Sequence, residues 1–365
     1  MSRNMKMYKI LTYEQIDREE WSRLVASSAT GTWFQTPEAY SFYASQPDLF
    51  QPFVVAISNE APLSEAQHSI NPSLQTLRAV CVGYVTVEKN PIKQFFTRRA
   101  IILGGPALAD DATNEEVEAL MKAVKEKLSF THSLIHSFIH SPIYIETRNF
   151  NDYSRWKGAF EKEGFNYQPH LNFHVHTDQP WDTIETNIGK HRKKYIRLSF
   201  RDGATIEENP TIDQVRAYYD ILLDLYRTKV KMPLQPWSFF EKLYYCRDCK
   251  YLLILYNGQV VGGSICMLLP GHGVYEWYAC GKDGVFKNIH PSSVTKYAGM
   301  KYACDNGYAI FDMMGAGKPK EEYGVRDFKA EFGGELVEHG RFLCITKPLL
   351  YNIGVLGVSI LKKLK

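Results

Sequence analysis

The sequence predicts an α/β protein of two tandem domains, each with a mixed, largely antiparallel sheet flanked by helices. The order hairpin, strand, helix, strand occurs twice along the chain. A length of 365 residues suits two domains, and 45% hydrophobic with 13% aromatic residues can fill two cores. We expect the domains at residues 1–177 and 178–346, followed by an amphipathic helix at 347–365.

The first half of the chain opens with a predicted helix at residues 16–26 and an aromatic segment at 33–43. Thr113 and Glu116 form a capping box, so we expect a helix from there to about residue 128. Runs of β-branched and other apolar residues predict strands at 53–57, 77–88, 100–103 and 142–147.

The second half begins at residues 170–176, where polar and apolar residues alternate and predict a half-buried strand with a polar outer face. The pair Asn257-Gly258 predicts a tight hairpin. Ser292 or Ser293 is expected to cap a helix that ends at Gly307. The remaining predictions are strands at 251–256, 260–268, 273–280 and 308–313, and a helix at 213–226.

Composition argues against several classes of protein. Seven scattered cysteines do not form a disulfide framework, and the lone Cys246 and Cys249 pair lacks the four ligands of structural zinc. His132, His136 and His140 recur every fourth residue without evident carboxylate partners, so no metal is expected. No signal-peptide core and no apolar run of about 20 residues is present. We therefore expect a cytoplasmic protein without a cofactor.

Local charge is concentrated in a helix predicted at residues 181–201. The net charge of the chain is only +3, so any preference for anions has to come from such clusters. Stacked like charges repel each other mildly, which favours an anion-binding role over the alternative of a solvated basic face. The expected apolar face holds Ile184, Ile188, His191, Tyr195 and Leu198, and the basic face holds Lys190, Lys193, Lys194, Arg197 and Arg201.

Residues 311–334, FDMMGAGKPKEEYGVRDFKAEFGG, contain the strongest candidate for chemistry. A short strand breaks at Gly315 and Gly317, and Lys329 follows within a segment flanked by Phe328 and Phe332. A cation held between aromatic rings is partly desolvated and can be aimed at a developing negative charge. The alternative is a surface loop with a snorkelling lysine. We expect replacement of a catalytic Lys329 by alanine to leave melting nearly unchanged.

This segment resembles the closing motif of the Fem-type (FemA/FemB/FemX-like) peptidyltransferases, relatives of the GNAT N-acyltransferases. In that family a strand ending in Asp and Gly precedes the pattern Gly-x-x-x-Phe-Lys-x-x-Phe-Gly. The resemblance extends through most of the chain, is strongest from Trp181 onward, and implies two tandem GNAT-like domains. The matching residues are Asp312, Gly315, Gly324, Phe328, Lys329, Phe332 and Gly333.

The resemblance implies an enzyme that forms an amide bond on an amine of a peptidoglycan-type precursor, with Lys329 stabilising the attacked carbonyl. The base is Asp312 or Glu276, unless the substrate itself takes the proton. Lys231 stands where family members often have the arginine of Thr-x-x-Arg, and an Arg-to-Lys change loses bidentate phosphate recognition. The expected substrate-binding residues are Lys190, Arg192, Lys193, Lys194, Arg197, Lys231, Arg326 and Phe328.

The donor and the class of activity have alternatives. Residues 287–293, KNIHPSS, lack the glycines with which CoA-dependent GNAT enzymes hold pyrophosphate. Aminoacyl-tRNA is therefore the favoured donor. A CoA-dependent N-acyltransferase acting on an amino sugar or another envelope precursor is the second interpretation. A non-catalytic anion-binding module that uses the basic helix is the third.

The C-terminal segment at 347–365 combines an apolar stripe with a lysine-rich end. It is too short to span a bilayer, so it either docks on the core or lies on a membrane surface. The second option would place the protein at the inner face of the membrane. The stripe holds Leu349, Ile353, Leu356, Ile360 and Leu364, and the lysines are Lys362, Lys363 and Lys365.

Overall fold

A computed structural model of the protein describes residues 8–59, 76–129 and 141–363. The chain divides into two compact units, and each is described by itself. Unit 1 holds Met1–Pro169 and His339–Lys365, and unit 2 holds His170–Glu338. Unit 2 begins and ends eight residues earlier than the domain expected at 178–346, and residues 339–365 belong to unit 1.

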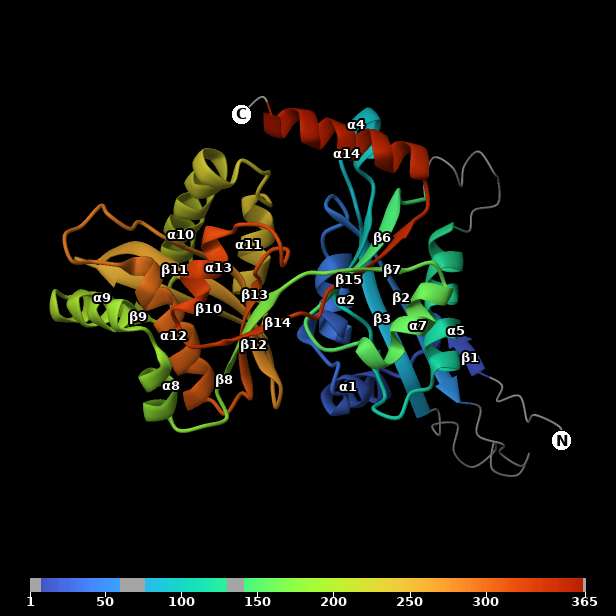
Figure 1. The fold of residues 1–365 in the computed structure, drawn as a ribbon, viewed down its shortest axis with the longest axis horizontal. Helices are drawn as coiled ribbons and strands as arrows, with labels where there is room; N and C mark the ends of the chain where they lie inside the picture. The colour runs from blue at the N-terminus through green and yellow to red at the C-terminus, as the bar shows by residue number, and fades with distance from the viewer. Residues whose placement is uncertain (1–7, 60–75, 130–140, 364–365) are drawn as a thin grey trace. The chain divides into compact units, whose positions relative to one another are not determined.

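The sheet of unit 1 has the order β1-β2-β3-β4-β6-β15-β7, with β5 beside β3 (Figure 1). Its neighbours are antiparallel except for β4 and β6, which are parallel. The strands are β1 (Tyr8–Leu11), β2 (Phe50–Asn59), β3 (Thr76–Thr86), β4 (Ala100–Gly104), β5 (Ala107–Leu108), β6 (Tyr144–Asn149), β7 (Asn166–Gln168) and β15 (Arg341–Ile345).

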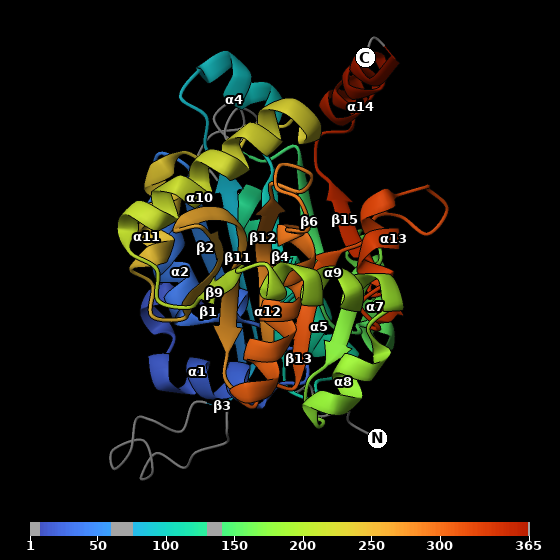
Figure 2. The same cartoon turned by 90° about the vertical axis from the view of Figure 1, so that its left-hand side faces the viewer.

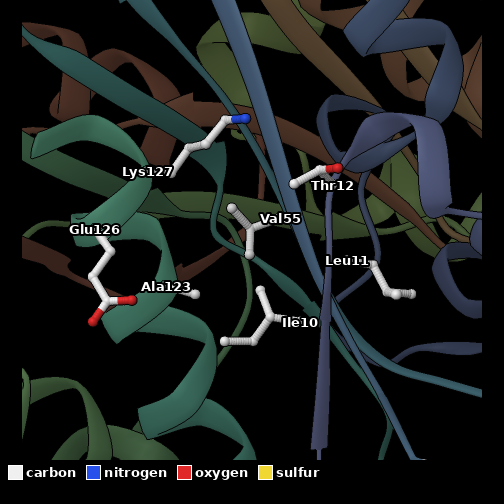
Figure 3. A pocket seen from close by; sticks show the side chains of 7 residues that line it. All are labelled: Ile10, Leu11, Thr12, Val55, Ala123, Glu126 and Lys127. Carbon is white, nitrogen blue, oxygen red and sulfur yellow. The ribbon is translucent and has the colours of Figure 1, made fainter. Parts of the chain in front are cut away.

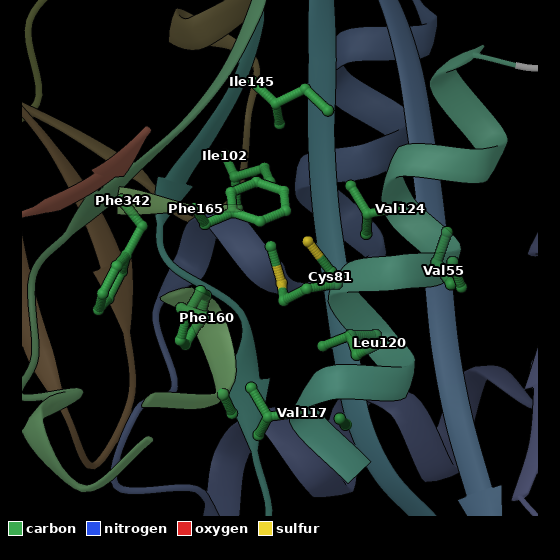
Figure 4. Packing of buried hydrophobic residues seen from close by; sticks show 14 of the residues in the cluster. Val55, Cys81, Ile102, Val117, Leu120, Val124, Ile145, Phe160, Phe165 and Phe342 are labelled. Carbon is green, nitrogen blue, oxygen red and sulfur yellow. The ribbon is translucent and has the colours of Figure 1, made fainter. Parts of the chain in front are cut away.

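Helix α5 (Asn114–Ser129) connects the two parallel strands of unit 1. Its capping box forms as predicted, because the Thr113 N–H donates to Glu116 Oε2 at 2.8 Å and the Glu116 N–H donates to Thr113 Oγ1 at 3.2 Å. Its apolar face packs on the sheet (Figure 4). The other helices of the unit are α1 (Arg18–Ser27), α2 (Pro37–Ala44), α4 (Pro91–Thr97), α7 (Lys157–Lys162) and α14 (Pro348–Lys363).

A shallow groove of about 510 Å³ lies between α5 and the edge strand β1. Ala123, Glu126 and Lys127 line it from the helix, and Ile10, Leu11 and Thr12 from the strand side (Figure 3). No residue predicted to take part in function lies there.

The sheet of unit 2 has the order β14-β8-β13-β12-β11-β10-β9, and only β12 and β13 are parallel. The predicted hairpin forms, with positive φ at both Asn257 and Gly258. The strands are β8 (Asn172–His176), β9 (Thr205–Glu207), β10 (Cys249–Tyr256), β11 (Gln259–Leu269), β12 (Gly273–Gly281), β13 (Ile310–Gly315) and β14 (Glu335–Val337).

Helices cover both faces of this sheet, since α12 lies against β10 to β12 (Figure 2) while α10 and α11 pack on the opposite face. Alternate residues of β10 show this: Leu252 joins the core under α12, and the Tyr251 hydroxyl donates to the Phe240 carbonyl of α11. The helices are α8 (Trp181–Asn187), α9 (Lys190–Arg201), α10 (Ile212–Leu225), α11 (Trp237–Tyr244), α12 (Pro291–Asp305) and α13 (Gly324–Ala330), with a π-helix, η4, at Tyr226–Val230.

The predicted duplication is confirmed by the topology of the two sheets. Helix α5 joins the parallel pair β4 and β6, as α12 joins the parallel pair β12 and β13. In each sheet, the second strand of the parallel pair has a further neighbour that does not belong to the strand-helix-strand unit. This neighbour is β8 in unit 2 and β15, from the far end of the chain, in unit 1. This exchange explains why the compact units begin and end where they do.

Three local predictions are corrected. The helix expected at 181–201 breaks at Gly189, whose N–H donates to the Glu331 carbonyl; a Cβ there would lie 3.1 Å from that oxygen. His191 is therefore exposed, and Ile196 and Ser199 are buried instead. Strand β8 buries Asn172 and His174 as well as its apolar residues, and His176 at its end is exposed. Helix α12 has His290 at its N-cap rather than Ser292 or Ser293.

No helix among the described residues is long and apolar enough to cross a membrane. Within the same residues no group of three His, Cys, Asp or Glu side chains is arranged to hold a metal ion. The three histidines spaced four residues apart, from His132 to His140, lie outside the described residues.

Candidate active site

The candidate site lies in unit 2, where the parallel strands β12 and β13 stop pairing. Pairing joins Gly273–Tyr275 to Ile310–Asp312 and goes no further. The register between β11 and β12 shifts just after this point, at Trp277. A cavity of about 120 Å³ opens between the end of β12, α12 and α13, lined by Ala279, Cys280, Ser292, Thr295, Lys296, Val325, Phe328 and Lys329.

Lys329, the residue predicted to be catalytic, lies on α13 and is only 6% exposed. Its ammonium donates to the carbonyls of Met313 at 2.5 Å, Gly315 at 2.9 Å and Met314 at 3.3 Å. The pKa of Lys329 is lowered to about 7, chiefly by burial and also by the charge of Lys296, against the opposing effects of Glu276 and Asp312. Lys329 is therefore a buried amine with a pKa near neutral pH, and its N–H groups donate to carbonyls at the end of β13.

Asp312, a predicted base, takes part in the same turn. Its Oδ1 accepts the N–H of Met314 at 2.6 Å, and Met314 has a φ of 59°, which is uncommon for a non-glycine residue. Its Oδ2 lies 3.4 Å from His174 Nε2. Burial by itself would lower the pKa of His174, but the neighbouring carboxylate outweighs this and raises it. Asp312 thus holds the turn that Lys329 closes, and it does not line the cavity.

Glu276, the other predicted base, forms a buried ion pair with Lys296 of α12 through Oε2. Lys296 lines the cavity, whereas Glu276 does not. Sequence reasoning missed Lys296, although a signal was present. It is a single charged residue within the otherwise apolar or small stretch from Val294 to Met300, and a charge at such a position is usually paired when it is buried.

Arg192 and Phe328 lie together at the rim of this site. The Arg192 guanidinium stacks over the Phe328 ring at 4.4 Å and donates to Glu331 Oε1 at 2.8 Å and Ser293 Oγ at 3.3 Å. Arg192 therefore ties α9 to α12 and α13. Arg326 faces its own loop, where it donates to the carbonyls of Lys318 and Glu321, and it does not line the cavity.

The other predicted substrate-binding residues lie outside the cavity. Lys190, Lys194 and Arg197 are exposed along α9, and Lys193 donates to the Thr186 carbonyl at 2.8 Å. Lys231 follows the π-helix, is exposed and has a φ of 54°. The structure thus separates a buried lysine site from an exposed basic surface on α9.

A carboxylate already occupies the N-terminus of α12, where a helix most readily binds an anion. Asp283 accepts the Ser292 N–H through Oδ1 at 3.3 Å and the Ser292 hydroxyl through Oδ2. The end of β12 also lies close to the N-terminus of α12, since a Cβ at Gly281 would lie 2.7 Å from the Ser292 nitrogen. A pyrophosphate at this helix end would have to displace Asp283.

Comparison with known proteins places this site in context. Residues 257–356, which include α12, β13 and α13, match the FemAB family. FemX has a similar fold, with a TM-score of 0.67 and 14% identity over 94% of this chain and 99% of FemX. No curated protein matches the chain.

Two further structures share the fold. The C-terminal domain of a candidate lysylphosphatidylglycerol synthetase from Agrobacterium fabrum has a TM-score of 0.54 at 11% identity, over 92% of this chain and 94% of that domain. A tandem GNAT protein from the clavulanic acid biosynthesis pathway has a TM-score of 0.52 at 8% identity, over 92% of this chain and 97% of that protein.

The chain shares the architecture of FemX and of a tandem GNAT protein. The FemAB match over residues 257–356 covers the part of unit 2 that carries the site. The match and the shared fold both support the predicted Fem-type family and the predicted acyltransferase class.

Proposed function

We propose that this protein transfers an aminoacyl group to an amine of a peptidoglycan-type envelope precursor. The observation that carries the proposal is the convergence of two buried lysines, Lys296 and Lys329, on one cavity at the end of the parallel strands. Burying a cation costs free energy that its partners often offset only in part, and preorganised positive charge is what acyl transfer needs. The Fem-type family and the neighbour whose name joins lysine to phosphatidylglycerol support this substrate class.

Amide formation creates one negative charge that the protein has to stabilise, on the oxygen of the attacked carbonyl. The acceptor amine attacks the ester carbonyl of the donor, a C–N bond forms, and the carbonyl oxygen becomes negative. The C–O bond to the donor then breaks, and the proton lost by the amine ends on the departing ribose oxygen. Lys329 can stabilise the oxygen by exchanging its longest contact, at 3.3 Å to the Met314 carbonyl, for the substrate.

Aminoacyl-tRNA suits the charges of unit 2 better than CoA does. Asp283 occupies the end of α12 where a pyrophosphate would otherwise bind. The exposed side chains of Lys190, Lys194 and Arg197 instead offer a row of cations for an extended polyanion. CoA-dependent N-acyl transfer is the second candidate, favoured by the shared fold with the tandem GNAT protein.

We expect tRNA to bind at low salt and acetyl-CoA to bind weakly or not at all. Replacing Lys190, Lys194 and Arg197 together with alanine should weaken tRNA binding and reduce the slope of log affinity against log salt by up to about 2 to 3. A gel-shift titration over salt concentration and calorimetry with acetyl-CoA measure these. The matched control replaces Lys122, Lys157 and Lys162, three exposed lysines of unit 1, and should leave tRNA binding nearly unchanged. Micromolar binding of acetyl-CoA, together with no binding of tRNA, would contradict the proposal that aminoacyl-tRNA is the donor.

We also propose that α14 rests on an anionic membrane surface. Leu349, Ile353 and Leu356 recur along one face and are 75%, 50% and 62% exposed, so the described part of the stripe is not packed on the core. Ile92 and Phe96 of α4 are exposed as well, and Lys347, at the start of α14, lies 5.9 Å from the ring of Phe95 on α4. Residues 347–365 contain no Asp or Glu, and their lysines favour acidic headgroups.

Leu349→Glu is expected to reduce sedimentation with vesicles of phosphatidylglycerol and phosphatidylcholine by about tenfold, because it places a charge on the apolar face. Leu336→Glu is the matched control, since Leu336 is an exposed leucine on β14 of unit 2. Equal sedimentation of the two variants with wild type would mean that α14 does not contact lipid.

A further inference from the structure

Lys296 differs from Lys329 in how its ammonium protons are used. An ammonium has three N–H donors. Lys329 directs all three at backbone carbonyls. Lys296 is 5% exposed, and its one hydrogen-bond acceptor within the described parts of the chain is Glu276 Oε2. Two of its donors therefore remain for a molecule that enters the cavity it lines.

Thr295 precedes Lys296 on α12 and lines the same cavity. It is 1% exposed, and its Oγ1 has no hydrogen-bond partner within the described residues. Buried hydroxyl groups are nearly always hydrogen bonded, and an exception calls for an explanation. A ligand oxygen in the cavity supplies one, because it can accept from this hydroxyl and from Lys296 together.

Glu276 is the buried partner that holds the Lys296 side chain in place. Its carboxylate lies on β12, faces α12 and pairs with Lys296 through Oε2, while Oε1 is buried without a partner among the described residues. A buried ion costs less free energy when an opposite charge pairs with it. The pair places the Lys296 ammonium at the cavity wall, and both side chains are buried.

We propose that Lys296 and Thr295 form an oxyanion site that binds the carbonyl oxygen of the donor's acyl group, with Glu276 as the residue that positions Lys296. This rests on the proposed acyl transfer. As the amine attacks, the oxygen takes hydrogen bonds from the Lys296 ammonium and the Thr295 hydroxyl, and neither group gives up its proton. When the C–O bond to the donor breaks, the carbonyl forms again and the two donors release it. Unlike Lys329, Lys296 needs no exchange of an existing contact.

The test compares Lys296→Met, Thr295→Val and Glu276→Gln in steady-state transfer. We expect kcat to fall about 100-fold for Lys296→Met, the size of effect seen when one oxyanion donor is removed, and about 10-fold for Thr295→Val. The KM for the donor should change less than threefold in each. Glu276→Gln should also lower kcat without raising KM. Lys301→Met is the matched control on the same helix, where Lys301 pairs with Asp305 near the surface, and it should keep the wild-type rate.

Because Lys296→Met leaves Glu276 buried without its cation, the double variant Lys296→Met, Glu276→Gln is measured as well. We expect it to melt closer to wild type while retaining the full loss of kcat. A folded double variant with wild-type kcat overturns the oxyanion site. Absence of turnover by the wild type with every aminoacyl and acyl donor would instead overturn the proposed function, so the two failures are distinct.

Discussion

Replacing Lys329 with methionine is expected to lower the transfer rate by about 100-fold or more, because the ammonium that stabilises the attacked carbonyl is lost. The structure also corrects the expectation that such a change leaves melting nearly unchanged. Lys329 is buried and donates to three carbonyls at the end of β13, so its loss leaves acceptors without partners. We expect a destabilisation of about 1 to 3 kcal/mol in addition to the rate effect, measured by denaturant unfolding.

Lys347→Met separates these two effects. Lys347 is a buried lysine of unit 1 that donates to the Ser141 carbonyl at 2.6 Å, so its loss also removes a buried ammonium from a backbone carbonyl. Its variant should unfold more easily yet keep the wild-type rate per folded molecule. If Lys329→Met is folded and transfers at the wild-type rate, Lys329 is structural only.

The pH dependence provides a further measure of the same prediction. The pKa of Lys329 is about 7 in the folded protein against an ordinary value of 10.5, so the unfolded chain binds one more proton between these values. Stability relative to Lys329→Met should therefore rise with pH above 7, by at most about 1.4 kcal/mol per pH unit, and level off above 10.5. The transfer rate of the wild type should fall over the same range as the ammonium is lost.

Phe342→Ala is expected to destabilise unit 1 by about 3 to 5 kcal/mol. Phe342 lies on β15, is 1% exposed, and stacks on Phe160 with ring centroids 4.1 Å apart. Since β15 lies between β6 and β7, a loss of packing here weakens two strand pairs of the sheet. Denaturant unfolding, monitored by hydrogen exchange, should show that the loss of stability is in unit 1.

Phe96→Ala is the matched control for this change, because Phe96 on α4 is half exposed. It should alter stability by less than about 1 kcal/mol. If the two alanine variants unfold at the same denaturant concentration, β15 does not contribute to the core as its burial indicates.

Features set by local chemistry could be predicted from the sequence. The capping box of Thr113 and Glu116 and the Asn257-Gly258 hairpin depend on neighbouring residues, and both form as expected. The repeated order of elements predicted the duplicated fold, because each parallel crossover needs a helix between its strands. The resemblance around Lys329 directed attention to α13, whose Phe328 and Lys329 line the cavity.

Only the tertiary structure decided which distant segments meet. Strand β15 pairs with β6 and β7, which lie about half the chain length away in sequence, and no local pattern in 341–345 selects those partners. The Lys296 and Glu276 pair joins a helix to a strand, and its burial follows from packing that neither segment specifies alone. Asp312 could be read as a base from its position, yet its Oδ1 accepts the Met314 N–H and its Oδ2 faces His174 in the core. Charge and hydrogen-bond partners inside a core depend on what packs there, and that is settled by the assembled sheet.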